Sequence, residues 1–410
     1  MTSYRVPGLT PTRRDALLSM TAMTACATLF RSLGVAAAAE DLFKIGWVRP
    51  TTGRFASSYA QIYVGGLIAI DEINSSGGIL GRKIERVEED DEASPAKEPG
   101  IVKKLQEEGC AYIFGPTGTS QSLAALATST PARIIQSAFA LGASLGDGTK
   151  YPYQYQATFN TDQQAYVVTR YLVDVQGVKK IGILQENTAF GTESVTATRE
   201  TLQSYGLAPA AIQTVPNLAP DLTPYLSNLQ KAGVDCVILW LANTPSLTLA
   251  FNGFAALKWY PKIAGHRQML IDAVANLVPD EAVSNVFATH IRTLTWSDRT
   301  SPGERQVAFA KKLANYPEVK GNEIVAGTAP FYDFLYLLKT VIETEKTFDT
   351  ARVKAALDKV TDYPGLLGNM SFTAEKHSAL IARDLAMVTL ESAKNPKAMG
   401  LFRELAPGET

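Results

Sequence analysis

The run Gly-Ala-Ser-Leu-Gly at 142–146 has the Gly-x-Ser-x-Gly spacing of serine hydrolases. In those enzymes the serine stands on a strained turn directly between a strand and a helix, and a histidine elsewhere in the chain takes its proton. His266, His290 and His377 all follow Ser144, so this order of groups is available. The residues after 146 read as a loop rather than a helix, which counts against the motif. A serine hydrolase that uses Ser144 stays the alternative from a different class of function.

Other groups that carry chemistry are few. The sequence contains no His-Glu-x-x-His pair, no Walker-type loop, no Gly-x-Gly-x-x-Gly after a strand and no cysteine–histidine cluster at zinc spacing. The acidic run 88–92 is interpreted as a surface turn, with a divalent-cation site as the alternative. Cys110 and Cys236 lie in apolar runs typical of buried strands, where a thiol is inert. We therefore expect no catalytic residue, no metal and no cofactor.

Composition excludes several partners. The chain has 410 residues, 46% of them hydrophobic and 19% charged, with a formal net charge of −1. The first 39 residues hold four arginines against one aspartate, so the remainder is mildly acidic. Nucleic acid and anionic membrane surfaces both require a basic face, and neither is expected as a partner. A chain of this length usually needs more than one core.

Residues 1–40 have the pattern of an export signal. The arginine pair at 13–14 directly precedes an apolar stretch, 16–30, that is too short to remain as a membrane-spanning helix. Small residues at 36–39 suit a signal peptidase. The pair resembles a twin-arginine signal, with a general secretory signal as the alternative, and Cys26 leaves lipidation open. We expect a periplasmic protein.

From residue 41, short β-branched runs alternate with segments whose apolar residues recur at helical spacing. Strands are predicted at 42–48, 83–88, 111–114 and 134–138, with helices at 59–74, 95–108 and from the loop 115–120 to about 127. The pattern restarts near residue 160, with strands at 180–184, 211–215, 234–239 and 262–264 and helices at 161–175, 191–205, 222–232, 245–257 and 271–277. The segment 286–290 is expected to lead back towards the first lobe, followed by helices at 302–315, 323–345 and 349–359 and strands at 385–390 and 401–404. Such repeated units predict an α/β fold with two parallel sheets, each covered on both faces.

The block 41–81 carries a family resemblance. It reads DLFKIGWVRPTTGRFASSYAQIYVGGLIAIDEINSSGGILG and is similar to the start of the branched-chain amino-acid-binding (Leu/Ile/Val-binding) proteins of bacterial ABC transporters. There a strand ends in a polar turn, and the next helix carries Gly-x-x-x-Ala-x-x-x-Ile-Asn and ends in Gly-Gly-Ile-x-Gly. Shorter agreements at 89–95, 114–116, 190–191 and 365–372 extend the resemblance over essentially the whole mature chain.

The resemblance implies a type I periplasmic-binding fold, in which two doubly wound parallel-sheet lobes are joined by a three-strand hinge and close over a ligand. Lobe 1 is expected to comprise 41–158 and 289–372, and lobe 2 to comprise 159–288 and 373–410. The implied partners are a small-molecule ligand and the membrane permease of an ABC transporter, with the binding protein itself a monomer.

Ligands of open α/β sheets bind just beyond the carboxyl ends of the strands. The resemblance places there a serine- and threonine-rich loop for a ligand carboxylate, with Thr119 in the key position. Helix N-terminal amides and a hydroxyl suit an anion, although Thr119 or Ser120 could equally be a plain helix cap. Phe190 could likewise be an ordinary core residue, and Tyr59 and Arg267 surface residues. The full predicted set is Ser58, Tyr59, Thr117, Gly118, Thr119, Ser120, Phe139, Ala140, Leu141, Phe190, Trp240, Asn243, His266 and Arg267.

Two departures from the family pattern bear on the ligand. Amino-acid binders carry Ala-x-Thr where this chain has Phe-Ala-Leu at 139–141, and an acid where it has His266 and Arg267, with Asp272 as the nearest acidic fallback. A buried ammonium without an anion is costly, whereas Arg267 suits a second carboxylate or a phenolic oxygen. Phe139, Phe190 and Trp240 are expected to wall a flat apolar body. We therefore expect a carboxylate ligand without an α-amino group, with an aromatic acid as the leading candidate and a branched-chain or aromatic amino acid as the alternative.

Overall fold

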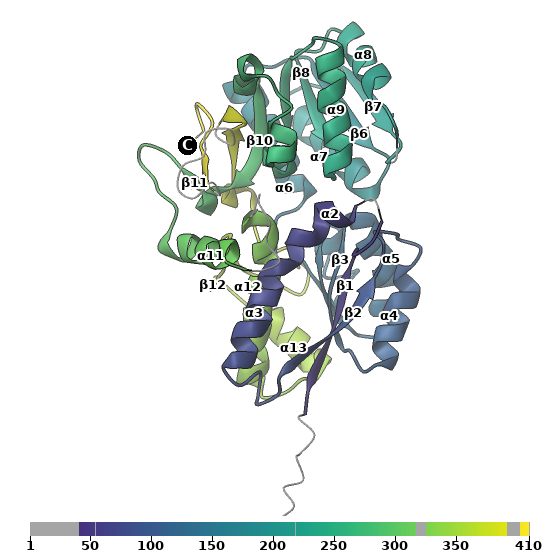
Figure 1. The fold of residues 1–410 in the computed structure, drawn as a ribbon, viewed down its shortest axis with the longest axis vertical. Coiled ribbons are helices and arrows are strands. Elements are labelled where there is room, and N and C mark those ends of the chain that lie inside the picture. The colour runs from purple at the N-terminus through teal and green to yellow at the C-terminus, as the bar shows by residue number, and fades with distance from the viewer. Residues whose placement is uncertain (1–40, 54, 218, 317–324, 392–401, 410) are drawn as a thin grey trace, which may run out of the picture. The chain divides into compact units, whose positions relative to one another are not determined.

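Five parallel strands form the sheet of the first lobe (Figure 1). The structure is a computed structural model that describes residues 41–53, 55–217, 219–316, 325–391 and 402–409. The predicted export signal, with its arginine pair and Cys26, therefore lies outside the described residues. In spatial order the strands are β2 (Ile84–Asp90), β1 (Phe43–Arg49), β3 (Tyr112–Thr117), β4 (Ile135–Phe139) and β5 (Gln154–Tyr155).

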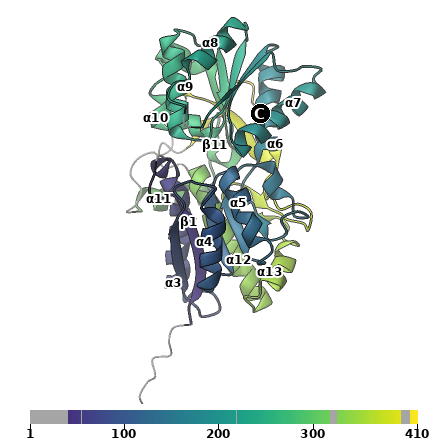
Figure 2. The same cartoon turned by 90° about the vertical axis from the view of Figure 1, so that its right-hand side faces the viewer.

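Helices cover both faces of this sheet, as the alternating strands and helices predicted. On one face lie α3 (Val64–Ser75) and α12 (Val325–Glu345), and on the other α4 (Glu98–Glu107) and α5 (Thr119–Ser129) (Figures 1 and 2). Successive β1 side chains alternate between them: Trp47 packs with the rings of the first face, and Val48 packs with α4. A Cβ at Gly66 would lie 2.5 Å from the Trp47 ring, so glycine there lets α3 approach the sheet.

The remaining helices of this lobe are shorter or lie at its margin. The single helix predicted at 59–74 is three successive pieces, because a 3-10 turn interrupts it before α3 begins. These pieces and the others are α2 (Ala56–Tyr59), η1 (Ala60–Tyr63), η2 (Ala143–Gly146), α11 (Glu304–Ala314) and α13 (Thr350–Leu357).

The second sheet has six strands, five of them parallel. In spatial order they are β14 (Leu385–Thr389), β10 (Val286–Ile291), β9 (Lys262–Gly265), β8 (Cys236–Trp240), β6 (Ile181–Glu186) and β7 (Ala211–Val215), and β14 is antiparallel to β10. The segment predicted at 286–290 is β10 itself, and the chain crosses towards the first lobe directly after it. Hydrogen bonds to β9 and β14 hold the whole of β10 in this sheet, so the boundary drawn between residues 288 and 289 divides a strand. The other domain boundaries stay a prediction.

Helices again cover both faces of the second sheet. Its helical elements are α6 (Thr161–Arg170), which continues into the π turn η3 (Tyr171–Val175), α7 (Ala189–Ser204), α8 (Thr223–Lys231), α9 (Thr244–Ala256), η4 (Arg267–Leu270), α10 (Asp272–Ala275) and η5 (Asp280–Asn285). Side-chain oxygens of Asn160, Thr188 and Asn243 accept backbone N–H bonds and fix where α6, α7 and α9 begin.

Within the described residues the chain crosses between the two sheets three times: after β5, after β10 and before β14. Two of these crossings pair directly, since Gln156 N–H donates to His377 O and Ala379 N–H donates to Gln156 O, both at 2.9 Å. The third reaches the same place through the Arg292 side chain, which donates to the carbonyls of Arg383 and Leu385. The three segments therefore form the joint that the family resemblance implies. The remaining described elements are two short turns and two short strand pairs: η6 (Arg292–Leu294), η7 (Ala382–Asp384), β11–β15 (Thr295–Trp296 with Arg403–Glu404) and β12–β13 (Tyr363–Pro364 with Asn369–Met370).

Both cysteines of the described chain are core residues, as predicted. Cys110 and Cys236 are buried and free, and burial raises the pKa of the Cys110 thiol to about 11. No helix in the described ranges has the length and hydropathy needed to cross a membrane.

Candidate ligand site

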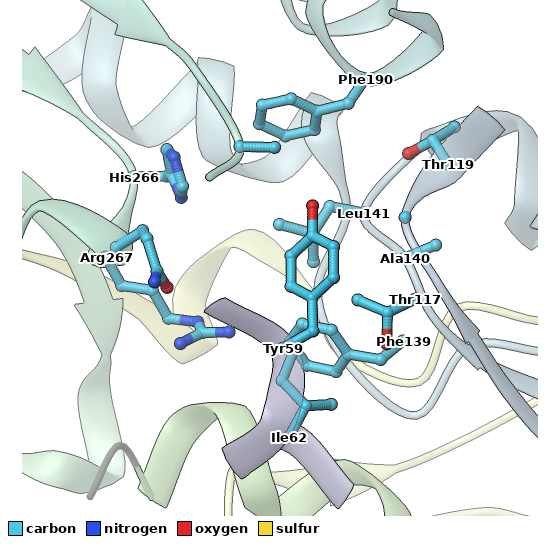
Figure 3. A pocket seen from close by; sticks show the side chains of 13 residues that line it. Tyr59, Ile62, Thr117, Thr119, Phe139, Ala140, Leu141, Phe190, His266 and Arg267 are labelled. Atoms are coloured by element: carbon cyan, nitrogen blue, oxygen red, sulfur yellow. The ribbon is translucent and has the colours of Figure 1, made fainter. Parts of the chain in front are cut away.

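A cavity between the lobes gathers most of the residues that the sequence analysis singled out (Figure 3). Its empty volume is about 470 Å³, part of it open to solvent. The predicted residues in its wall are Tyr59, Thr117, Gly118, Thr119, Phe139, Ala140 and Leu141 from the first lobe and Phe190, His266 and Arg267 from the second. Ile62, Ala242 and Gln268 complete it.

The first lobe presents the amino end of α5 to this cavity. Gly118 is the N-cap residue, with φ of +104°, a conformation that favours glycine, and because glycine has no side chain it cannot cap the helix amides. The first intrahelical bond runs from Ser122 N–H to Gly118 O, so the amides of residues 119–121 precede it. Amides in this position attract anions.

The hydroxyls of this loop are not helix caps, so the plain-cap interpretation is wrong. Thr119 Oγ1 accepts the N–H of Gly142 at 3.0 Å, and Ser120 Oγ accepts the N–H of Ala189 at 3.1 Å. Because Thr119 Oγ1 acts as an acceptor in this bond, its own hydroxyl hydrogen stays available to donate. Ser120 lies outside the cavity wall and instead joins the lobes, because Ala189 belongs to α7 of the second lobe.

Aromatic rings form the apolar part of the wall. Tyr59 is half-buried rather than a surface residue, and burial raises the pKa of its hydroxyl, with a further contribution from Glu186. The Phe190 ring is packed edge-on against His266, with centroids 5.6 Å apart, and lines the cavity as well as belonging to the core. Trp240 does not wall the cavity: it lies behind Phe190, 6.3 Å between centroids, and its Nε1 donates to Thr198.

His266 is a neutral member of the wall. Its Nε2 lies 2.6 Å from Leu241 O, and because a carbonyl only accepts, Nε2 carries the hydrogen. Burial, with a smaller contribution from the charge of Arg267, lowers the pKa of His266 to about 4. Nδ1 is therefore an acceptor at neutral pH.

Arg267 is buried rather than a surface residue. Only 5% of it is exposed, and its guanidinium lies over the Phe139 ring at 5.3 Å from the centroid. Burial lowers the pKa of Arg267 to about 10, which leaves it charged at neutral pH. Among the described residues it forms no ion pair, and its Nε has no hydrogen-bond partner.

No acidic side chain lines the cavity among the described residues. Glu186 is the acid that acts on Tyr59, but its oxygens already accept the Thr188 hydroxyl at 2.7 Å and the Ala242 N–H at 3.0 Å. Asp272, the acidic fallback of the sequence analysis, has its side chain outside the described part of the chain. The wall therefore presents one unpaired cation and no described carboxylate.

Two further predicted residues do not line this cavity. Asn243 is the cap of α9: its Oδ1 accepts the Ser246 N–H at 2.9 Å. Ser58 lies in the wall of a neighbouring cavity. Sequence reasoning missed Ile62, which lies on the 3-10 turn after Tyr59, and Ala242, although its position two residues after β8 was a usable signal.

The hydrolase alternative has no support in the geometry. Ser144 lies in a 3-10 turn, and its hydroxyl donates to Glu193 at 2.8 Å. His266 bonds a carbonyl, and His377 bonds the Gln154 carbonyl and Asp358. Among the described residues, no histidine side chain forms a hydrogen bond with Ser144.

The acidic run at 88–92 is not a plain surface turn. Asp91 is fully buried beside Glu98, while the Asp90 carboxylate accepts the Thr51 N–H at 2.9 Å and the Thr52 hydroxyl at 2.6 Å. No group of three or more potential metal ligands occurs in the described ranges.

Comparisons with known proteins agree with this fold. A family model described as periplasmic binding protein matches residues 43–395. The Leu/Ile/Val-binding protein BraC3 of Rhizobium johnstonii is 25% identical, over 86% of this chain and 93% of its own.

Two solved structures have a similar fold. The branched-chain amino acid transporter substrate-binding protein of Streptococcus pneumoniae, in complex with isoleucine, has a TM-score of 0.73 at 19% identity and covers 89% of this chain and 99% of its own. A solute-binding protein of an ABC transporter from Rhodopseudomonas palustris, in complex with 4-hydroxybenzoate, has a TM-score of 0.72 at 19% identity, with 85% and 93% covered. Proteins of this family are substrate-binding proteins of ABC transporters rather than enzymes, and the family implies a periplasmic location. From its match over most of its length, this chain belongs to the periplasmic binding protein family.

Proposed function

We propose that this protein is the substrate-binding component of an ABC importer and that its ligand is a small organic acid without an α-amino group, with an aromatic or similarly flat apolar body. The observation that carries the proposal is Arg267: a buried cation without a described acid, in a wall with no described carboxylate. A zwitterionic amino acid would add a second buried cation, which needs an anion of its own.

The binding mechanism follows from the two sides of the cavity. A ligand carboxylate meets the amides at the start of α5 and the Thr119 hydroxyl. Closure then brings Phe190 and His266 of the second lobe over the apolar body and Arg267 towards a second oxygen-bearing group. No bond is made or broken, so the site needs orientation and desolvation only, and the permease receives the closed form.

Contacts across the cleft support closure as the binding step. Ser120 Oγ accepts the Ala189 N–H, and the Glu193 carboxylate accepts both the N–H and the hydroxyl of Ser144, at 3.1 and 2.8 Å. Each bond joins one lobe to the other and is lost when the lobes separate. Binding energy from the ligand is therefore coupled to the formation of these bonds.

The test uses ligand pairs that differ only in the α-amino group: 3-phenylpropionate against phenylalanine, and 4-methylpentanoate against leucine. Benzoate, 4-hydroxybenzoate and cinnamate extend the panel. We expect the amino-free member of a pair to bind roughly ten- to a hundred-fold more tightly by titration calorimetry, because an unpaired buried polar group costs about 1–3 kcal/mol. Tighter binding of leucine and phenylalanine would keep the transport role and make the acid assignment wrong.

Export by the twin-arginine route and a monomeric state belong to the same proposal. Replacing the arginine pair at 13–14 by lysines is expected to hold the precursor in the cytoplasm, as cell fractionation would show. Sedimentation of the mature protein is expected to give the mass of one chain. If the variant with lysines at 13–14 still reached the periplasm, export by the general secretory route would be favoured instead.

A further inference from the structure

A second cavity adjoins the candidate ligand site on the other side of Arg267. It has an empty volume of about 730 Å³, part of it open to solvent, and Ile62, Arg267 and Gln268 line both cavities. Its other walls come from α2, α9, α10 and α12. The space available to a ligand is therefore larger than the volume of the first cavity, which is lined by Tyr59, Phe139 and Phe190 and is called the aromatic cavity below.

The second cavity is polar where the first is aromatic. Ser58, Thr244 and Gln268 face it, and Arg267 is its one charged residue among those described. Ser58 Oγ is buried and has no hydrogen-bond partner. Thr244 Oγ1 accepts a bond from Gln268 Nε2 at 3.0 Å and keeps its own hydrogen to donate. Two hydroxyl donors therefore lie ready for an oxygen-rich group.

The Arg267 guanidinium stands at the junction of the two cavities. It has a ring of the aromatic cavity, Phe139, on one side. On another side, a Cβ built at Gly327 would lie 3.1 Å from Nη1 and 3.2 Å from Nη2, so glycine leaves room for the guanidinium. Its Nε has no partner among the described residues, and a buried, planar group of donors is suited to a carboxylate.

We propose that the ligand is an elongated dicarboxylate, with one carboxylate at the start of α5 and the second in the polar cavity beyond Arg267. This rests on the proposed function, since it assumes that the aromatic cavity holds an acid. The Thr119 end and the Arg267 end each offer donors without an anion, and the rings of Tyr59, Phe139 and Phe190 lie between them. A monocarboxylate leaves one of these ends without an anion, and a dianion supplies both.

The test compares ligands of equal length that differ in the second charge. The probes are benzoate, 4-propylbenzoate and 4-(2-carboxyethyl)benzoate, titrated by calorimetry into the mature protein. We expect the dicarboxylate to bind at least about tenfold more tightly than 4-propylbenzoate, because hydrogen bonds between charged groups are strong. Equal or tighter binding of 4-propylbenzoate would overturn the proposal.

A variant that fills the polar cavity provides the second arm. Ala273 is exposed and lies at the edge of this cavity only, so Ala273→Phe narrows it at little risk to folding. In this variant the preference for the dicarboxylate is expected to fall to less than about threefold, while benzoate affinity stays within about twofold. A preference that stays tenfold in Ala273→Phe would place the second carboxylate elsewhere and overturn the proposal.

The failures of the two proposals are distinguishable. If benzoate and 4-propylbenzoate bind but the second carboxylate adds nothing, only the dicarboxylate assignment fails. If none of the acids binds and an amino acid does, the proposed ligand class fails, and the dicarboxylate assignment fails with it.

Discussion

Replacing Arg267 by methionine should affect stability and binding in opposite directions. Burial lowers the pKa of Arg267 to about 10, and at about 1.4 kcal/mol per pKa unit the burial of its charge costs roughly 3 kcal/mol. Methionine has a similar length, adapts its shape and needs no counter-ion. Apolar replacements of buried charged groups are often neutral or stabilising, by about 1–4 kcal/mol. We expect ligand-free Arg267→Met to be more stable than the parent by about 1–3 kcal/mol.

The same change should weaken ligand binding. A hydrogen bond to a charged partner contributes about 1.5–3 kcal/mol, so a carboxylate that contacts Arg267 should bind roughly 10- to 150-fold less tightly to the variant. The ligand-induced rise in melting temperature should shrink accordingly. Calorimetric unfolding of the ligand-free and ligand-bound forms, with titration of the best acid of the panel, measures both effects on one sample.

The matched control is Arg199→Met, since Arg199 is exposed on α7 and lies in neither cavity. It should change stability by no more than about 0.5 kcal/mol and leave affinity unchanged. If Arg267→Met instead destabilised the ligand-free protein by more than about 1 kcal/mol, Arg267 would be held by structural contacts. The inference that a ligand supplies its missing anion would then be refuted.

Three further perturbations test other parts of the site. Thr119→Val removes the hydroxyl and leaves the Gly142 N–H without an acceptor. The affinity for a carboxylate ligand, measured by titration, should fall about tenfold, and the free energy of unfolding, measured with denaturant, should fall by about 1 kcal/mol. Unchanged affinity would contradict the placement of the carboxylate. Glu193→Ala removes both hydrogen bonds that join Ser144 to Glu193 across the cleft. The ligand-free variant should then show a larger radius of gyration by small-angle scattering, and ligand affinity should fall about tenfold. An unchanged radius of gyration would contradict the role of these bonds in holding the lobes together. Burial and, second, the charge of Asp91 raise the pKa of Glu98 to about 10 in the folded protein, whereas in the unfolded chain Glu98 loses its proton near its ordinary pKa. The folded state therefore binds the Glu98 proton more tightly, and the free energy of unfolding of the unmodified protein should fall as pH rises between about 5 and 9. Glu98→Gln should reduce this pH dependence, measured by urea unfolding at each pH.

Most of the fold was predictable because its information is local. The predicted strands at 111–114, 180–184 and 234–239 overlap β3, β6 and β8, since buried parallel strands are largely continuous apolar runs. The exception was β10, whose neighbour β14 lies about a hundred residues further along the chain. Periodicity within a segment carries no information on such a partner, so the predicted lobe boundary between residues 288 and 289 fell inside this strand.

The site was predictable to the level of loops but not of side-chain directions. Thr119 and Trp240 were both selected because they lie near the ends of strands, yet only Thr119 lines the cavity. Trp240 is the last residue of β8, and successive strand residues point to opposite faces of the sheet. Its ring points towards α7, where its Nε1 bonds Thr198. One residue of register decides between a ligand contact and a core position, and a single sequence does not fix that register.

The residue types that cap helices are also those that bind anions, so sequence alone could not separate the two roles. Asn243 and Ser120 were predicted to bind ligand, but their side-chain oxygens accept protein amides. Ser58 Oγ and Arg267 Nε, by contrast, are buried without a partner among the described residues. A buried polar atom without a partner costs free energy that a bound ligand can recover. Such atoms also occur in the core away from both cavities, so an unpartnered polar atom points to the ligand only where it belongs to a residue that lines a cavity, as Ser58 and Arg267 do.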